Sequence, residues 1–467
     1  MGNLNTAGVS ADVRTRMLNY LNYVPSAAWL AGKEPSHGPI LDDPTLGYGD
    51  NVNDYDIGLT VAKRILNKKN SLAGQQFTTL NQLNGIDYLG QDKFDDLVYT
   101  FSRYWELFLN VNLFAQTQWF YCGAASAQMI LDYVNNWGGN PQLTQLNLYN
   151  TIQNFKTDNN FYTDPDGLCG CLNQESPAAN QWLVHSGNSV DETTRKLLVT
   201  METYDAPPAA LIFDGDHWVV VSGTTATEGP SMNKPSFIVY TIQVQDPGGG
   251  GQTRDIEYQN WITNFFTPNT WGATFNNRYV GVYDPKVKAK KKVSFIPQNL
   301  KTKGKRMISL KDAQKYAQES LVDYHLTSQK VYKKALRGAK VGTPIPVKNL
   351  RVKSKPFYYL VPFEKNNRTS LVVMINAYYG NYLGSSVVDK PKGYLAVKER
   401  AATNRVVKAL KARRKKVDKA HLVWKPSVLS WDPFEPVWKI KLNGRVRYVN
   451  QQKKVASQMK RARMGGM

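Results

Sequence analysis

Residues Gln116–Val134, QTQWFYCGAASAQMILDYV, decide the fold and predict a strand-like approach to Cys122 followed by a helix. Small residues follow the cysteine and apolar residues come next, so this helix has no polar face and belongs in a core. Gly138 and Gly139 are expected to end it at Trp137. A thiol in the first turn of a buried helix lies near the positive end of the helix dipole, which favours the thiolate. The stretch therefore indicates a candidate nucleophile.

Partners for such a nucleophile occur at the edges of other predicted core elements. Gln116 lies six residues before Cys122 and can donate towards an oxyanion, with Gln118 as the alternative. His217 opens the second run of PPAALIFDGDHWVVVSG, a pattern that predicts a tight hairpin. Asp246 ends the run FIVYTIQVQD and precedes a proline and four glycines. The order cysteine, histidine, acid supplies a nucleophile, a base and an orienting group.

A buried cysteine is also a common small hydrophobe, and this alternative reading stays open for Cys122 taken alone. In combination, the Gln-x5-Cys-Gly-x-Ala entry, the HWVVVSG strand and the QDP strand end resemble papain-like cysteine peptidases of the bacteriocin-leader-processing (double-glycine) type, over residues 106–285. The resemblance implies that Cys122 is the nucleophile, His217 the general base and acid, Asp246 the orienting group and Gln116 the oxyanion donor. One departure is that transport-coupled members carry fused membrane domains, whereas this sequence contains no apolar run long enough for a membrane helix.

The resemblance implies an α+β fold and a peptide or protein substrate. The predicted activity is that of a papain-like cysteine peptidase, or of a related thiol amidohydrolase or acyltransferase. We expect no cofactor and no metal. With no apolar signal stretch at the N-terminus, a cytoplasmic location is favoured over non-classical export.

Length and cysteine content set further bounds. The chain has 467 residues, 42% of them hydrophobic, which is enough for two to four domains with real cores. Three cysteines do not make a disulfide scaffold. We expect Cys169 and Cys171, in DGLCGCLNQ, to be incidental thiols in a loop, with a regulatory redox pair as the alternative.

Charge divides the chain into two unequal halves. From Lys286 onward there are 44 lysines and arginines against 9 acidic residues, whereas the preceding part holds 15 against 28. The break falls in a basic linker predicted for residues 286–306. The basic half predicts contact with nucleic acid or another polyanion, and a non-enzymatic adaptor of this kind is the alternative function. Docking on the acidic half of the same chain, or a role in keeping the protein soluble, explains the charge equally well.

Residues 1–105 are expected to form a helical region. Within it, residues 58–104 resemble a helix-hairpin-helix module, with Leu89 and Gly90 in the hairpin. The pattern departs from that family at Tyr88, where the first hairpin glycine is expected, and Asp92, Asp95 and Asp96 would repel phosphate. A structural or protein-contacting helical pair is therefore favoured over DNA binding.

The C-terminal half predicts a repeated order of a helix followed by a hairpin. Ser309 is expected to cap a helix, and the strands PFYYLVPFE and TSLVVMINA follow it. Residues 307–390 resemble a PepSY-type module, and 391–467 form a candidate degenerate second copy with a basic helix over 399–416 and an Asn443-Gly444 hairpin. The resemblance implies regulation of, or docking to, a peptidase, and an envelope or exterior location.

Overall fold

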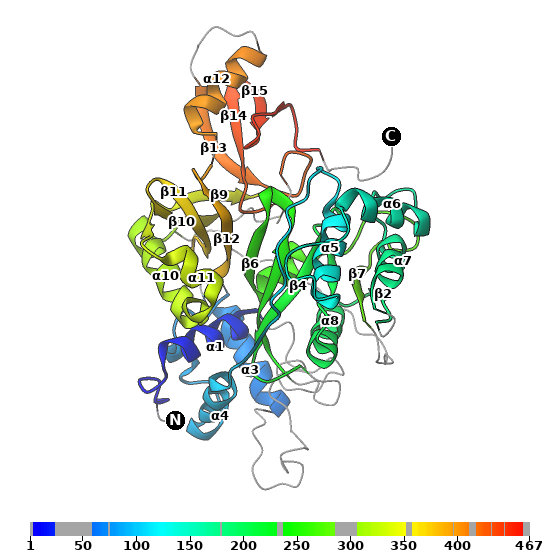
Figure 1. The fold of residues 1–467 in the computed structure, drawn as a ribbon. Helices are drawn as coiled ribbons and strands as arrows, with labels where there is room; N and C mark the ends of the chain where they lie inside the picture. Colours follow the sequence, from blue (N-terminus) through cyan, green and yellow to red (C-terminus); the bar gives the residue numbers. More distant parts are fainter. Residues whose placement is uncertain are drawn as a thin grey trace.

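The computed structural model describes residues 3–23, 58–72, 75–177, 180–230, 237–284, 306–351, 357–395, 397–410, 417–430, 432–442 and 444–460. The predicted linker over 286–306 lies outside these residues except for Arg306, as does the end of the predicted basic helix at 411–416. The described chain is α+β, with helices around one large mixed sheet (Figure 1).

The described residues of the N-terminal region form helices. Its elements are α1 (Ala11–Tyr23), α3 (Gly58–Ser71), a 3-10 turn (Leu80–Leu83) and α4 (Gln91–Ser102). Two helices thus flank the Leu89-Gly90 segment, and Tyr88 adopts the positive φ of 64° that a glycine would supply.

The middle of the chain contains the candidate site. Its helices are α5 (Cys122–Val134), α6 (Gln145–Phe155), α7 (Pro165–Glu175), α8 (Val190–Tyr204) and the short α9 (Tyr258–Asn260), which runs into a π-helical turn (Trp261–Phe265). Its strands are β1 (Trp105–Phe108), β2 (Leu183–Gly187), β3 (Ala209–Ile212), β4 (His217–Ala226), β5 (Val239–Asp246), β6 (Gln252–Glu257) and β7 (Tyr279–Tyr283). A 3-10 turn, Gly248–Gly250, links β5 to β6.

The C-terminal part begins with helix α10 (Leu310–Asp323), which Ser309 caps as predicted by accepting from the Asp312 amide at 3.0 Å. The elements that follow are a 3-10 turn (Leu326–Ser328), α11 (Lys330–Leu336), β8 (Lys340–Val341), β9 (Ile345–Asn349), β10 (Phe357–Lys365), β11 (Arg368–Asn376), β12 (Tyr382–Lys392), α12 (Glu399–Ala409), β13 (Val417–Trp424), β14 (Val437–Leu442), β15 (Arg445–Val449) and β16 (Val455–Ala456). The predicted hairpins β10–β11 and β14–β15 are both confirmed.

One sheet runs through both halves of the described chain. Its order is β16-β15-β14-β13-β9-β10-β11-β12-β6-β5-β4-β3-β7-β2, with β1 added to β4 and β8 to β10. All pairings are antiparallel except that of β9 with β13. The halves join where β6 pairs with β12, Ser385 lying opposite Asp255. This joint has no local signal in the sequence, because it pairs strands about 130 residues apart.

Both faces of the β10–β11 hairpin are buried, which explains why its strands are apolar without interruption. Leu360, Val372 and Met374 pack into the core shared with the middle of the chain. Their neighbours Val361 and Val373 point the other way, into a core with the N-terminal helices and with α10 and α11. Figure 1 shows α1 beside α10 at this second face.

The DGLCGCLNQ segment is not the loop that we expected. It lies in α7, because Asp164 caps the helix by accepting from the Gly167 amide at 2.7 Å and Pro165 occupies the first helical position. Cys169 and Cys171 are free thiols on this helix. Burial raises the pKa of Cys169 to about 11 and that of Cys171 to about 12.

Asp255 is a fully buried carboxyl at the joint between the two halves. Its oxygens accept hydrogen bonds from Thr241 Oγ1 at 2.8 Å and Tyr382 Oη at 3.1 Å. Burial raises the pKa of Asp255 to about 7, against the lowering effect of these two hydrogen bonds. The joint therefore contains a carboxyl that keeps its proton in mildly acidic solution.

We expect Asp255→Asn to flatten the pH dependence of stability. The pKa of Asp255 rises from 3.8 to about 7 on folding. The stabilisation from its proton is therefore fully present below pH 3.8, falls as pH rises, and is gone above the folded pKa. This loss is roughly 1.4 kcal/mol per pH unit between the two values. Urea unfolding at several pH values measures it, and Asp92→Asn, at an exposed carboxyl of α4, is the control. Equal slopes for Asp255→Asn and the wild type would contradict a protonated Asp255.

Candidate active site

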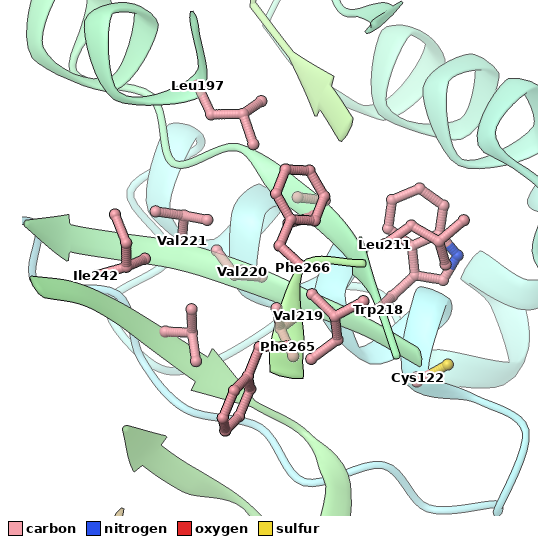
Figure 2. Packing of buried hydrophobic residues seen from close by; sticks show 14 of the residues in the cluster. Cys122, Leu197, Leu211, Trp218, Val219, Val220, Val221, Ile242, Phe265 and Phe266 are labelled. Carbon is pink, nitrogen blue, oxygen red and sulfur yellow. The ribbon is translucent and has the colours of Figure 1, made fainter. Parts of the chain in front are cut away.

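Helix α5 places Cys122 at its first helical position, with Tyr121 as the N-cap residue. The backbone N–H of Cys122 therefore has no acceptor within the helix. Residues 122–132 are all buried, as expected for a helix that is apolar all round, and only 2% of Cys122 is exposed. Figure 2 shows Cys122 at the edge of the cluster formed with residues of β3 and β4.

Gly123 allows the start of α5 to approach Thr163 closely. A Cβ atom at Gly123 would lie 2.3 Å from Thr163 Cγ2 and 2.5 Å from its Cβ. Thr163 cannot readily move, because its carbonyl accepts a hydrogen bond from the buried Trp218 indole at 2.9 Å. The glycine after the cysteine is thus a packing requirement of the site.

Helix α5 ends earlier than we expected. It stops at Val134, and Asn136 (φ 54°) supplies the left-handed residue. The Asn136 amide donates to the Tyr133 carbonyl and the Trp137 amide to the Asp132 carbonyl, which is a Schellman motif. Gly138 and Gly139 also have positive φ, but they lie beyond the helix end.

The approach to Cys122 is a turn, not the predicted strand. The Tyr121 amide donates to the Gln118 carbonyl at 3.1 Å, and the Gln116 amide donates to the Pro247 carbonyl at 3.0 Å. The side-chain Nε2 of Gln116 donates to the carbonyls of Gln118 and Trp119 at 3.0 and 2.9 Å. Gln116 therefore holds the turn before Cys122, and residue Gln118 is exposed.

His217 is the first residue of β4 and opens the second strand of the predicted hairpin. Ile212 pairs with His217, so the β3–β4 connection spans four residues. Asp214 and Gly215 have the positive φ values, 66° and 90°, that a type I′ turn requires, and Phe213 is also left-handed at 55°. The Phe213 ring stacks on the His217 ring with centroids 6.4 Å apart.

The structure brings Cys122, His217 and Asp246 together. His217 Nε2 lies 2.7 Å from Asp246 Oδ1, and the Cys122 side chain is close enough to contribute to raising the pKa of His217. Because Asp246 takes Nε2, Nδ1 is the ring nitrogen left for the sulfur. Oδ1 of Asp246 accepts a second hydrogen bond, from the Gly248 amide at 2.7 Å.

Electrostatics favour a charged imidazole at this position. Burial alone would lower the pKa of His217, but the Asp246 charge and hydrogen bond, together with Cys122, raise it to about 10. Burial also works against ionisation of Asp246, but the charges of Arg254 and His217 hold the pKa of Asp246 well below its usual range. An imidazolium backed by a carboxylate is the partner that favours a thiolate.

Arg254 is a site residue that the sequence analysis missed. It lies on β6, and its Nε is 2.9 Å from Asp246 Oδ2. On the antiparallel pair β5–β6, Arg254 is opposite Val244 and hence diagonal to Asp246 on the same face. Predicting β6 and its register with β5 would have indicated this contact.

Within the α+β fold, a cysteine at a helix start thus lies beside a histidine and an acid from neighbouring strands, which are the residue types of a nucleophile, a base and an orienting group. A model of the Peptidase_C39 like family matches residues 108–279 and supports a relationship to papain-like C39 peptidases. This segment therefore points to a cysteine peptidase-like function. No curated protein matches the chain significantly.

Among solved structures, the chain is similar to the Bacillus megaterium YpeB C-terminal domain at 12% identity, covering 59% of this chain and 88% of that one. The TM-score of 0.15 is too low to carry any argument about the fold. Within the described residues, no helix has both the length and the apolar character needed to cross a membrane.

Gly123→Ala tests the packing at the start of α5. The added methyl group meets Thr163 and must displace either that residue or Cys122, and overpacking of this kind costs about 1–3 kcal/mol. We expect the free energy of unfolding, measured in urea, to fall by that amount. The control is Gly8→Ala, because Gly8 is exposed and a Cβ atom there meets nothing within 4 Å. Wild-type stability for Gly123→Ala would contradict the close approach.

Proposed function

We propose that the chain is a papain-like cysteine peptidase, or a related thiol amidohydrolase or acyltransferase, that acts through Cys122, His217 and Asp246. The observation that carries this proposal is the hydrogen bond between His217 and Asp246 next to Cys122, which lies at the start of a buried helix. A cysteine that served only to fill the core would not need a histidine with a carboxylate behind it.

In the proposed reaction the Cys122 thiolate attacks a peptide or amide carbonyl carbon, and the carbonyl oxygen becomes an oxyanion. The Cys122 backbone N–H, at the first helical position, donates to that oxygen. The His217 imidazolium then protonates the leaving amine as the C–N bond breaks. Water, activated by the neutral imidazole, hydrolyses the thioester and restores the pair.

Gln116 is the proposed second oxyanion donor. Its side-chain nitrogen donates to two carbonyls of the turn, so it must exchange one of these bonds to donate to the substrate. Binding of a substrate carbonyl next to the Cys122 amide would favour this exchange, because the developing negative charge is the stronger acceptor.

Peptides or proteins are the proposed substrates. An amine in place of water would make the same residues an acyltransferase. The C-terminal module over 307–390 is proposed to regulate or dock to the peptidase part, because it continues the same sheet through β12 and β6. The basic C-terminal half also provides a surface for a polyanion.

Labelling of Cys122 with iodoacetamide, followed by peptide mapping, tests the proposed nucleophile. A small reagent is needed because Cys122 is only 2% exposed. We expect labelling near neutral pH in the wild type and its collapse in His217→Ala, which removes the imidazolium. Cys169 and Cys171 are internal references in the same digest, because burial raises the pKa of each thiol to about 11 and 12.

Two results would contradict the proposal. In one, Cys122 in the wild type labels only at alkaline pH; in the other, His217→Ala labels as fast as the wild type. Either would leave the papain-like part as a binding scaffold, and salt-dependent retention of the full chain on DNA and on a non-nucleic polyanion would then test the adaptor function.

A further inference from the structure

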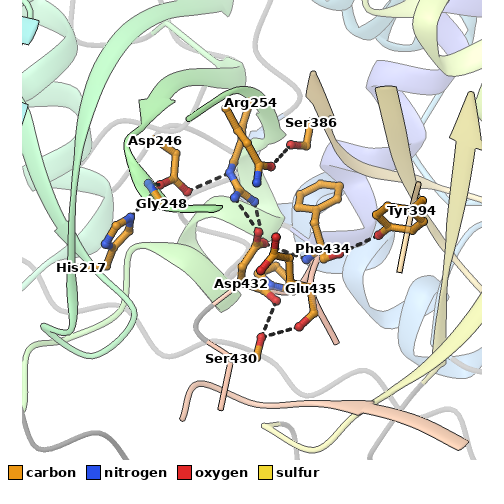
Figure 3. A network of polar contacts seen from close by, with 12 residues as sticks. His217, Asp246, Gly248, Arg254, Ser386, Tyr394, Ser430, Asp432, Phe434 and Glu435 are labelled. Carbon is orange, nitrogen blue, oxygen red and sulfur yellow. Dashed lines mark hydrogen bonds and ion pairs between the residues drawn. The ribbon is translucent and has the colours of Figure 1, made fainter. Parts of the chain in front are cut away.

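A single buried guanidinium joins the acid of the proposed site to the C-terminal half. Arg254 Nε lies 2.9 Å from Asp246 Oδ2, while Nη1 and Nη2 donate to the two carboxylate oxygens of Asp432 at 2.6 Å each (Figure 3). The Nε contact is an ion pair, since its N–H is not aligned for a hydrogen bond. Only 1% of the Arg254 side chain is exposed.

Residues of the C-terminal half fix the loop that carries Asp432. Oδ1 of Asp432 accepts from the Phe434 amide at 2.8 Å. Tyr358 Oη, from β10, donates to the Pro433 carbonyl at 2.7 Å, and Tyr394 Oη donates to the Phe434 carbonyl at 2.6 Å. Asp432 therefore stands at a defined position relative to β10 and the sheet, not on a loose loop.

We propose that Arg254 is a positioning residue for the site, and that Asp432 holds it in place from the C-terminal half. Oδ1 of Asp246 is held by His217 and the Gly248 amide, and Oδ2 is held by Arg254. A carboxylate fixed at both oxygens cannot rotate away from the imidazole. The inference rests on the proposed peptidase function and extends the machinery to a residue 178 positions further along the chain.

The contacts require an arginine, not only a positive charge. The planar guanidinium grips Asp432 with its two terminal nitrogens while Nε faces Asp246. The Phe434 ring lies 5.2 Å from Cζ and covers the group. A lysine at position 254 would supply the charge but could not hold two carboxylates in this geometry.

Four variants of the full chain separate the effect of the guanidinium geometry from the effect of its charge. They are Arg254→Lys, Arg254→Gln, Asp432→Asn and the double variant Arg254→Lys/Asp432→Asn. The readout is the rate of Cys122 labelling by iodoacetamide over a range of pH. Loss of the geometry in Arg254→Lys and Asp432→Asn should slow labelling roughly tenfold at every pH, because the imidazole is no longer fixed. The double variant should be no slower than either single variant, since both changes break one series of contacts.

Arg254→Gln removes the charge as well. Asp246 is then buried without its main counter-charge. The pH below which the labelling rate falls off should therefore rise by about one pH unit or more. Arg254→Lys and Asp432→Asn retain the positive charge at position 254, so their labelling rates should fall off at the same pH as in the wild type. If Arg254→Gln does not fold, these two variants still carry the test through their rates.

The matched control is Asp191→Asn, which breaks the buried Asp191–Arg195 pair of α8 and leaves Asp246 intact. It should label like the wild type, with thermal melts showing which variants are folded. Wild-type labelling in both Arg254→Lys and Asp432→Asn would overturn the positioning role while leaving the proposed function standing. A wild-type Cys122 no faster than Cys169 would instead overturn the proposed function, and the inference with it.

Discussion

The site depends on the buried carboxylate of Asp246 staying ionised and pointing at His217. Burial opposes the charge, and the fold offsets this with the guanidinium of Arg254 and the amide of Gly248. The charge of Asp246 in turn raises the pKa of His217 to about 10, although burial alone would lower it. The charge of the imidazole beside Cys122 thus depends on Asp246.

The continuous sheet brings the required groups to one place. Asp246 ends β5, the Gly248–Gly250 turn follows, and β6 returns with Arg254 on the same face. The next neighbour of β6 is β12, so the strand that carries Arg254 is also the joint with the C-terminal half. Sheet pairing therefore places a C-terminal acid within reach of the site.

Two ion pairs connect the acidic half of the chain to the basic half. Arg254 comes from the acidic half and pairs with Asp432, one of the few acids of the basic half. Arg351 of the basic half pairs with Asp214 of the β3–β4 turn, three residues before His217. The Arg351–Asp214 pair follows the net charges of the two halves, whereas the Arg254–Asp432 pair runs against them.

The sequence predicted those features of the fold that are local. Helix α5, the strand that begins at His217 and the strand that ends at Asp246 each follow from apolar runs bounded by turn residues. The aromatic residues before Cys122 are typical of a strand and predict one. The Gln116 side chain instead donates to two backbone carbonyls there and folds the segment into a turn. The bonds that fold a turn on itself leave no periodic signal.

Long-range contacts could not be predicted in the same way. Nothing near Arg254 in the sequence signals Asp432, because the pairing depends on β6 meeting β12 and on a loop held by Tyr358. The two buried faces of β10 and β11 produced apolar runs that predicted strands but not what covers them. Which elements pair across the chain follows from the whole core.

The central claim is that the His217 imidazole is protonated beside Cys122 at neutral pH, because the Asp246 carboxylate faces it. The most direct measurement is a pH titration of the histidine ring signals by NMR, with the His217 signal assigned as the one that is missing from His217→Ala. We expect His217 to stay protonated through neutral pH and to lose its proton near pH 10. Loss of the proton near the pH of an ordinary histidine, about 6.5, would contradict this claim.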